Sequence, residues 1–141
     1  MLNTDLIRKI ADRIEHEPDR YNQRVFIDPD EERVRWERDG DSEFEVPTPA
    51  IDCGTAFCIA GWAMAESDYL FDYTANEFMR PDGTYVTSEI HEGARLLGLH
   101  LDAAAILFDS DWRPLNMTPA DALREIANSD GSFDAVHEVT R

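Results

Sequence analysis

The chain has 141 residues (1–141), of which 43% are hydrophobic and 10% aromatic, and its 30 acidic and 13 basic residues give a net charge of −17. This apolar content excludes an intrinsically disordered chain, and no apolar run is long enough for a membrane helix or a signal peptide, so we expect one cytoplasmic domain with reduced cysteines. The acidic excess disfavours direct binding to nucleic acid or membranes and favours a protein partner with a basic surface. Solubility, or adaptation to a salty or GC-rich host, is the preferred explanation of the acidity itself.

The first predicted element is an amphipathic helix near the N-terminus. Asn3 or Thr4 can cap it, because their side-chain oxygens accept hydrogen bonds from the first unpaired backbone N–H groups. Pro18 ends it, since proline lacks the N–H that a helix interior needs. Apolar residues recur on one face of this helix at helical spacing, namely Leu6, Ile7, Ile10, Ala11 and Ile14.

Residues 33–46 predict an antiparallel β-hairpin, because apolar and charged residues alternate on both sides of Asp39-Gly40. A short strand at 25–27 can join it. We expect this accessory hairpin to present a contact surface for a partner protein, with packing of Trp36 onto the domain itself as the alternative. The residues of this predicted surface are Arg33, Arg35, Trp36, Glu37, Asp39, Glu43 and Glu45.

The stretch CGTAFCIAGWA at 53–63 predicts a central buried helix over about 55–66. Thr55 is placed to cap this helix, and apolar side chains cover nearly its whole circumference, as is typical of a helix surrounded by other elements. Alanine and glycine at its surface allow neighbouring elements to approach closely. We interpret the stretch as a structural motif formed by Cys53, Gly54, Thr55, Cys58, Gly61 and Trp62.

The remainder of the chain predicts further helices and little sheet. Residues 68–80 are aromatic and irregular, and 84–87 predict at most a short strand. Thr87 or Ser88 can cap the next helix, and Gly98 is placed to end it. Helical patterns cover 88–97, 103–108, 119–127 after the helix-start sequence TPAD, and one or two turns from 133 to 139. The sequence therefore predicts a mostly helical α+β fold, with four to five helices around the central helix.

Cys53 is the candidate for nucleophilic chemistry, because the positive end of a helix dipole lowers the pKa of a thiol placed before the helix start. A cysteine hydrolase also needs a histidine base that a third polar group holds, and His91 or His100 would have to serve. All four histidines lie in or beside predicted helices, and the predicted strands are too few for the sheet of such an enzyme. Burial of both cysteines in the core is the favoured interpretation.

Metal and carboxylate chemistry have weaker support. Cys53 and Cys58 have no partner motif at a familiar zinc spacing, and a reducing cytoplasm disfavours a disulfide between them, so we expect no metal and no cofactor. Two acidic clusters are interpreted as solvated loops, with a glycosidase-like acid pair left open. They consist of Asp28, Asp30, Glu31 and Glu32, and of Asp102, Asp109 and Asp111.

Several short motifs resemble those of a group of small uncharacterised proteins of actinobacteria and their phages. The most specific is the Cys-Gly-Thr-x-x-Cys-x-Ala-Gly-x-Ala helix, which matches Cys53 to Ala63. The others are His16-Glu17-Pro18, Tyr21-Asn22-Gln23, Leu96-Leu97-Gly98-Leu99 and Leu107-Phe108. The resemblance implies a common fold and a phage origin, but no activity, and this chain departs from the group in its acidic hairpin at 33–46.

The function predicted from these observations is a non-enzymatic interaction protein, encoded by a phage and binding a host protein in the host cytoplasm. The alternatives are an acidic DNA mimic that inhibits a nucleic-acid-acting enzyme, and a cysteine-dependent enzyme that uses Cys53. Binding by a DNA mimic would weaken steeply with salt and compete with DNA. The oligomeric state and the identity of the partner are left open by the sequence.

Overall fold

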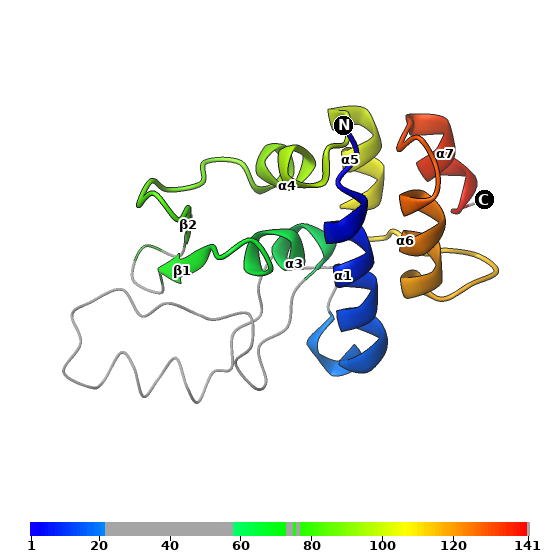
Figure 1. The fold of residues 1–141 in the computed structure, drawn as a ribbon, viewed down its shortest axis with the longest axis horizontal. Coiled ribbons are helices and arrows are strands. Elements are labelled where there is room, and N and C mark those ends of the chain that lie inside the picture. Colours follow the sequence, from blue (N-terminus) through cyan, green and yellow to red (C-terminus); the bar gives the residue numbers. More distant parts are fainter. Residues whose placement is uncertain (22–57, 73–74, 76, 141) are drawn as a thin grey trace.

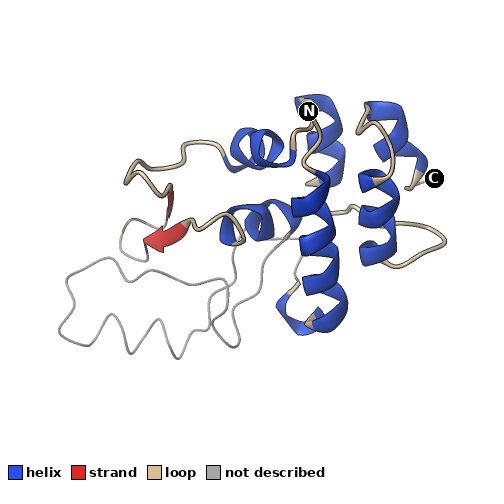
Figure 2. Ribbon diagram, viewed as in Figure 1, coloured by secondary structure: helices blue, strands red, loops and turns tan. Residues whose placement is uncertain are grey.

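The computed structural model describes residues 1–21, 58–72, 75 and 77–140. Within these residues, the fold consists of six α-helices, a short 3-10 helix and a two-stranded antiparallel sheet (Figures 1 and 2). This confirms the mostly helical α+β class. The hairpin predicted at 33–46 and the strand predicted at 25–27 lie outside the described residues.

The N-terminal helix packs against a helix from the far end of the sequence. Helix α1 (Thr4–His16) is capped by Asn3, whose side-chain oxygen accepts from the backbone N–H of Leu6. The 3-10 helix η1 (Pro18–Arg20) follows it. The partner of α1 is α6 (Pro119–Ala127), which begins after the cap residue Thr118. Both starts are as predicted, because each cap acts on backbone groups within its own first turn.

Helix α3 (Ile59–Ala65) lies at the centre of the fold, where it contacts α1 and α4 (Glu89–Leu97), and all seven of its residues are buried. The predicted start of this helix after Thr55 is wrong. Cys58 has an extended backbone, with φ −77° and ψ −179°, and its Sγ accepts from the backbone N–H of Gly61 at 3.4 Å. Because Cys58 caps α3, the helix cannot extend back to Thr55, which lies outside the described residues.

An ion pair joins α3 to α1. Glu66, the residue after α3, has a side chain that is 5% exposed. Its carboxylate accepts from Nε of Arg13 at 2.8 Å and lies 3.2 Å from Nζ of Lys9. Two cations on α1 therefore compensate a nearly buried negative charge at the end of the central helix.

The segment 68–80, which we predicted to be irregular, contains a small hairpin. Strands β1 (Leu70–Asp72) and β2 (Glu77–Met79) pair antiparallel, with Phe71 opposite Phe78. These two rings are buried and meet edge to face, with centroids 5.2 Å apart. Burial of this cross-strand aromatic pair against the helices stabilises so short a hairpin. The strand predicted at 84–87 is reduced to a single bridge between Met79 and Tyr85.

The C-terminal half supplies the remaining helices. Helix α4 (Glu89–Leu97) is capped by Ser88 and ends at Gly98, which adopts the left-handed conformation with φ +71°. Helix α5 (Leu101–Leu107) begins two residues earlier than predicted, because His100 takes the cap position without a side-chain hydrogen bond. Helix α7 (Phe133–Glu138) is capped by Ser132 and contacts α5.

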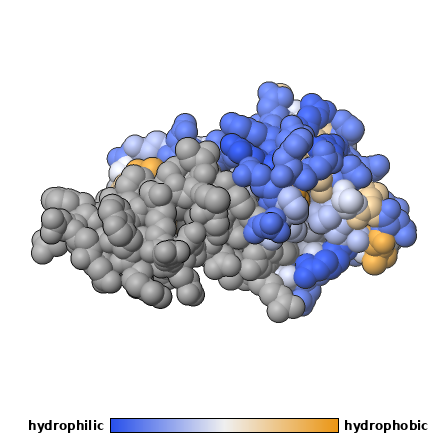
Figure 3. Space-filling model, turned by 90° about the horizontal axis from the view of Figure 1, so that it is seen from below, coloured by the Kyte–Doolittle hydropathy of each residue, from blue (hydrophilic) through white to orange (hydrophobic). Residues whose placement is uncertain are grey.

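One cluster of buried apolar residues receives side chains from both strands and from all six described α-helices. Seen from below, the described surface is mostly hydrophilic, with apolar residues in small areas (Figure 3). The large apolar side chains left exposed in the described part of the chain are those of Met1, Ile90, Leu101, Leu115 and Phe133. None of the helices described combines the length and apolar composition that crossing a bilayer requires.

Candidate functional site

The cysteine motif is only partly within the described residues. Cys53, Gly54 and Thr55 lie outside them, as does the predicted contact surface at 33–46. Cys58, Gly61 and Trp62 are all buried. Burial raises the pKa of the Cys58 thiol to about 11, because the hydrogen bond from the backbone of Gly61 only partly offsets the loss of solvation. Cys58 is therefore a neutral thiol at physiological pH and does not supply a nucleophile.

One serine–histidine contact exists among the described residues. The hydroxyl of Ser88 lies 2.8 Å from Nδ1 of His91 and also accepts from the backbone N–H of His91 at 3.4 Å, which makes Ser88 the cap of α4. No carboxylate in the described part of the chain bonds to His91, so the pair lacks the third group of a catalytic triad. Nor do the described residues bring together three side chains that could hold a metal ion.

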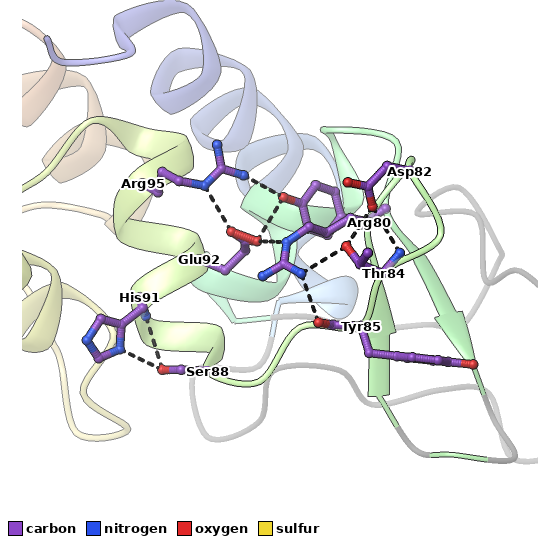
Figure 4. A network of polar contacts seen from close by, with 9 residues as sticks. Arg80, Asp82, Thr84, Tyr85, Ser88, His91, Glu92 and Arg95 are labelled. Atoms are coloured by element: carbon purple, nitrogen blue, oxygen red, sulfur yellow. Dashed lines mark hydrogen bonds and ion pairs between the residues drawn. The ribbon is translucent and has the colours of Figure 1, made fainter.

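A polar cluster connects the sheet to α4 (Figure 4). The carboxylate of Glu92 accepts from Nε of Arg80 at 2.6 Å, from Nε of Arg95 at 2.9 Å and from the hydroxyl of Tyr69 at 3.1 Å. Burial alone would raise the pKa of Glu92, but these hydrogen bonds outweigh it and hold the pKa below its usual value. Both carboxylate oxygens are thus engaged within the protein, and the cluster holds elements together rather than offering a binding site.

The best candidate for a site is an open groove between α5 and α7, with a volume of about 740 Å³. One wall is a single face of α5 and its C-terminal end, where lining residues recur at positions i, i+3, i+4 and i+7. The other wall is one face of α7, where they recur at i, i+4 and i+7. The residues of the first wall are Asp102, Ala105, Ile106 and Asp109, and those of the second are Phe133, His137 and Thr140. We call this feature the α5–α7 groove.

The segment after α5 closes the groove with Asp111, Trp112 and Arg113. A turn holds this segment in place, because the backbone N–H of Trp112 donates to the carbonyl of Asp109 at 3.0 Å and that of Asp111 donates to the Asp109 carboxylate at 2.7 Å. The Trp112 side chain is 4% exposed, and its indole N–H has no hydrogen-bond partner among the described residues. Arg113 donates to the carbonyl of Trp112 at 2.7 Å.

The groove has an acidic and an apolar character. Asp102, Asp109 and Asp111 are all exposed, and among the described residues that line the groove they outnumber the one arginine, Arg113. Among the described residues, neither Asp102 nor Asp111 forms an ion pair. Their negative charge is therefore available to a cation that enters the groove.

Apolar side chains supply the remaining lining. The rings of Phe133 and His137 stack with centroids 5.8 Å apart and an angle of 30° between their planes. Phe133 is 41% exposed, which leaves part of its ring in contact with water. Ile106 lies on the opposite wall. An apolar side chain that enters the groove would displace water from these surfaces, which is favourable.

The three aspartates of the groove stand out in the sequence as an acidic cluster, which we interpreted as a solvated loop. Nothing in the sequence connects them with Phe133 or His137, which are more than 20 residues further along the chain. The signal available was the shared helical face of Asp102, Ile106 and Asp109. Comparison of the chain with protein-family models, with curated proteins and with solved structures found no match.

Proposed function

We propose that the protein is a non-enzymatic interaction protein that binds a basic segment of another protein in the α5–α7 groove. The observation that carries this proposal is the combination, in one groove, of three carboxylates with exposed apolar surface. Apolar contact contributes affinity, while the charges select the partner and accelerate its association.

Two other carboxylates of the described chain differ from those of Asp102 and Asp111, because they form ion pairs within the protein. Glu66 and Glu92 are nearly buried, and each is paired with two cations of the protein itself. Such charges stabilise the fold and are not available to a ligand. Asp102 and Asp111 are exposed and form no such pairs within the described residues, so the surplus negative charge of the groove favours a cationic partner.

The net charge of the chain also favours a partner other than a second copy of this chain. Two copies would each carry −17, and their mutual repulsion opposes association unless a large apolar interface offsets it. Nucleic acid is repelled for the same reason. A basic protein is attracted by both the groove and the overall field. Because the chain resembles phage proteins, we propose that this basic partner is a protein of the host.

The test compares two variants that carry the same charge change. The groove variant combines Asp102→Asn, Asp109→Asn and Asp111→Asn, in which asparagine keeps the ability to accept hydrogen bonds. The control variant combines Asp5→Asn, Asp19→Asn and Glu125→Gln, three exposed positions outside the groove.

Wild type and both variants are immobilised and exposed to an actinobacterial lysate, and the captured proteins are identified by mass spectrometry. We expect basic proteins that wild type and the control variant retain and that the groove variant loses. The proposal is wrong if the groove variant retains the same proteins as the control, or if the proteins that it loses are not basic.

A further inference from the structure

The α5–α7 groove contains an exposed aromatic ring. Phe133 is 41% exposed, and no other phenylalanine, tyrosine or tryptophan among the described residues is exposed to this degree. The ring of His137 stacks on that of Phe133 with centroids 5.8 Å apart, which holds the Phe133 ring in place. An aromatic ring that is partly open to water attracts a cation to its face.

Two carboxylates of the groove have oxygens that accept no hydrogen bond from the described residues. One oxygen of Asp102 accepts from the backbone N–H of Ala103 at 2.7 Å, and the other accepts none there. The Asp111 carboxylate is likewise unpaired within the described residues. Asp109 differs, because its carboxylate accepts from the backbone N–H of Asp111 at 2.7 Å and holds the turn after α5. The charge available to a ligand is therefore that of Asp102 and Asp111.

The α5 wall leaves room in the groove for a long side chain. Ala105 lies three residues after Asp102 on the same face of α5 and is exposed. Its methyl group fills little of a groove of about 740 Å³. Ile106 continues this wall with a partly buried apolar side chain. The groove therefore admits an aliphatic chain that ends in a cationic group.

The arginine that lines the groove does not neutralise this charge. Arg113 donates to the backbone carbonyl of Trp112 at 2.7 Å and forms no ion pair with a carboxylate in the described part of the chain. Asp102 and Asp111 therefore lack a cationic partner at hydrogen-bond distance among the described residues.

We infer that the side chain recognised in the α5–α7 groove is an arginine of the partner, whose guanidinium lies on the exposed part of the Phe133 ring and donates to the Asp102 and Asp111 carboxylates. This inference rests on the proposed function and names the residue type by which the groove selects its basic partner. A guanidinium is planar, so its face contacts a ring while its N–H groups, which lie in its plane, remain free to donate to carboxylates. The aliphatic part of the arginine is placed against Ile106.

Lysine fits the same groove less well. Its ammonium is a compact and strongly hydrated charge, whereas a guanidinium is weakly hydrated and is transferred from water to an aromatic surface at a lower cost. An ammonium also has no flat face to match that of Phe133. Both cations pair with Asp102 and Asp111, so the difference in affinity between them comes from the ring.

The probes are three fluorescent peptides that share one neutral sequence, rich in glycine and serine, with a central leucine. They carry arginine, lysine or citrulline at the same three positions. Citrulline keeps the planar end group of arginine but has no charge. Binding of each peptide to the full chain is measured by fluorescence anisotropy at low salt.

Two sets of variants test the groove residues separately. Phe133→Leu removes the ring but keeps an apolar side chain, and Phe133→Tyr keeps the ring. The double variant Asp102→Asn/Asp111→Asn has as its control Asp5→Asn/Asp19→Asn, which makes the same charge change at two exposed positions outside the groove. Circular dichroism checks that each variant is folded.

We expect wild type to bind the arginine peptide at least about threefold more tightly than the lysine peptide, because a cation–π contact at a partly exposed ring contributes a factor of this order. Phe133→Tyr should keep this preference, and Phe133→Leu should lose it. The citrulline peptide should bind wild type at least about fivefold more weakly than the arginine peptide. Asp102→Asn/Asp111→Asn should weaken binding of the arginine peptide by a similar factor relative to its control, because two partly exposed ion pairs are lost.

The outcomes separate this inference from the proposed function. Equal binding of the arginine and lysine peptides to wild type would overturn the recognition of arginine, as would equal binding of the citrulline peptide or no binding of any peptide. A preference for arginine that persists in folded Phe133→Leu, or binding that Asp102→Asn/Asp111→Asn leaves unchanged, would show that arginine is not recognised by these residues. In each of these cases, selective loss of basic proteins by the groove variant in the lysate experiment would leave the proposed function standing.

Discussion

Glu92→Gln tests whether the polar cluster between the sheet and α4 stabilises the fold through its charge. The Glu92 side chain is 5% exposed and accepts hydrogen bonds from Arg80, Arg95 and Tyr69. Glutamine keeps nearly the same volume. It removes the negative charge, however, and replaces one acceptor oxygen with an amide group that cannot accept from a guanidinium.

The expected loss follows from the exposure of each partner. A hydrogen bond between Arg80, whose side chain is 30% exposed, and a buried carboxylate contributes about 1.5–3 kcal/mol. The Arg95 side chain is 63% exposed, so solvent screening limits its contribution to about 0.5 kcal/mol. The hydroxyl of Tyr69 can donate to the amide oxygen instead. We therefore expect the free energy of unfolding to fall by about 2–3 kcal/mol.

The measurement is urea unfolding at neutral pH, followed by circular dichroism, of wild type, Glu92→Gln and the control Glu125→Gln. Glu125 is an exposed residue of α6 whose side chain forms no hydrogen bond or ion pair within the described residues. We expect a lower midpoint with an unchanged slope for Glu92→Gln and almost no change for the control. Equal midpoints for the two variants would refute the argument.

The pH dependence gives a second check on the same substitution. The pKa of Glu92 is lowered in the folded protein, because the hydrogen bonds that it accepts outweigh the effect of burial. A lowered pKa contributes stability that is complete above the unfolded pKa, about 4.3, and is lost as the pH falls through the folded pKa. The stability difference between wild type and Glu92→Gln should therefore shrink on acidification. A difference that stays constant would show that the charge is not its cause.

Three further substitutions or treatments have defined outcomes. Gly98→Ala should lower the free energy of unfolding, measured by thermal unfolding, by about 1 kcal/mol more than Gly83→Ala. Both glycines have positive φ, but only at Gly98 would the new Cβ collide with the Met1 carbonyl, so equal losses would contradict this. Because burial raises its pKa to about 11, Cys58 should resist alkylation at about pH 8 until the protein unfolds, and rapid labelling of its peptide by mass spectrometry would show otherwise. Arg124→Gln should lower the free energy of unfolding in urea by less than about 1 kcal/mol, because the three carboxylates that contact Arg124 are 48–63% exposed and solvent screens their charges. A loss above about 2 kcal/mol would contradict this screening.

The helix ends could be predicted from the sequence because their signals are local. Asn3, Ser88 and Thr118 each accept a hydrogen bond from a backbone N–H three residues further on. Gly98 ends α4 because it tolerates a left-handed backbone. Each of these features depends only on atoms within one turn, so distant parts of the chain do not alter them.

The start of α3 and the β1–β2 hairpin could not be predicted, because the local sequence allows more than one structure there and tertiary contacts select one of them. Thr55 is a better capping residue than cysteine, yet the buried Cys58 caps α3. The sequence between the two strands contains no strong turn signal. The pairing of Phe71 with Phe78 is stabilised by the burial of both rings. The start of α3 and the formation of the hairpin therefore depend on which helices pack against these segments.

The α5–α7 groove shows the same limit for the candidate site. Asp102 and Asp109 were visible as a cluster, and their common helical face follows from their spacing. The partner wall comes from Phe133 and His137, which only the packing of α7 on α5 brings opposite them. A sequence pattern can place residues on one helix face, but it does not specify which helix lies across from it.

The packing of α1 on α6 has a consequence for biosynthesis. The two helices are about 100 residues apart in sequence, and contacts such as that between Arg8 and Asn128 form only when both are present. At about 5–20 residues per second, the ribosome needs roughly 5–20 s to synthesise the intervening chain. Throughout that interval, the apolar face of α1 that includes Ile7 and Ile10 lacks the partner that covers it in the folded protein. The speed of translation before α6 therefore sets how long a chaperone has access to this helix.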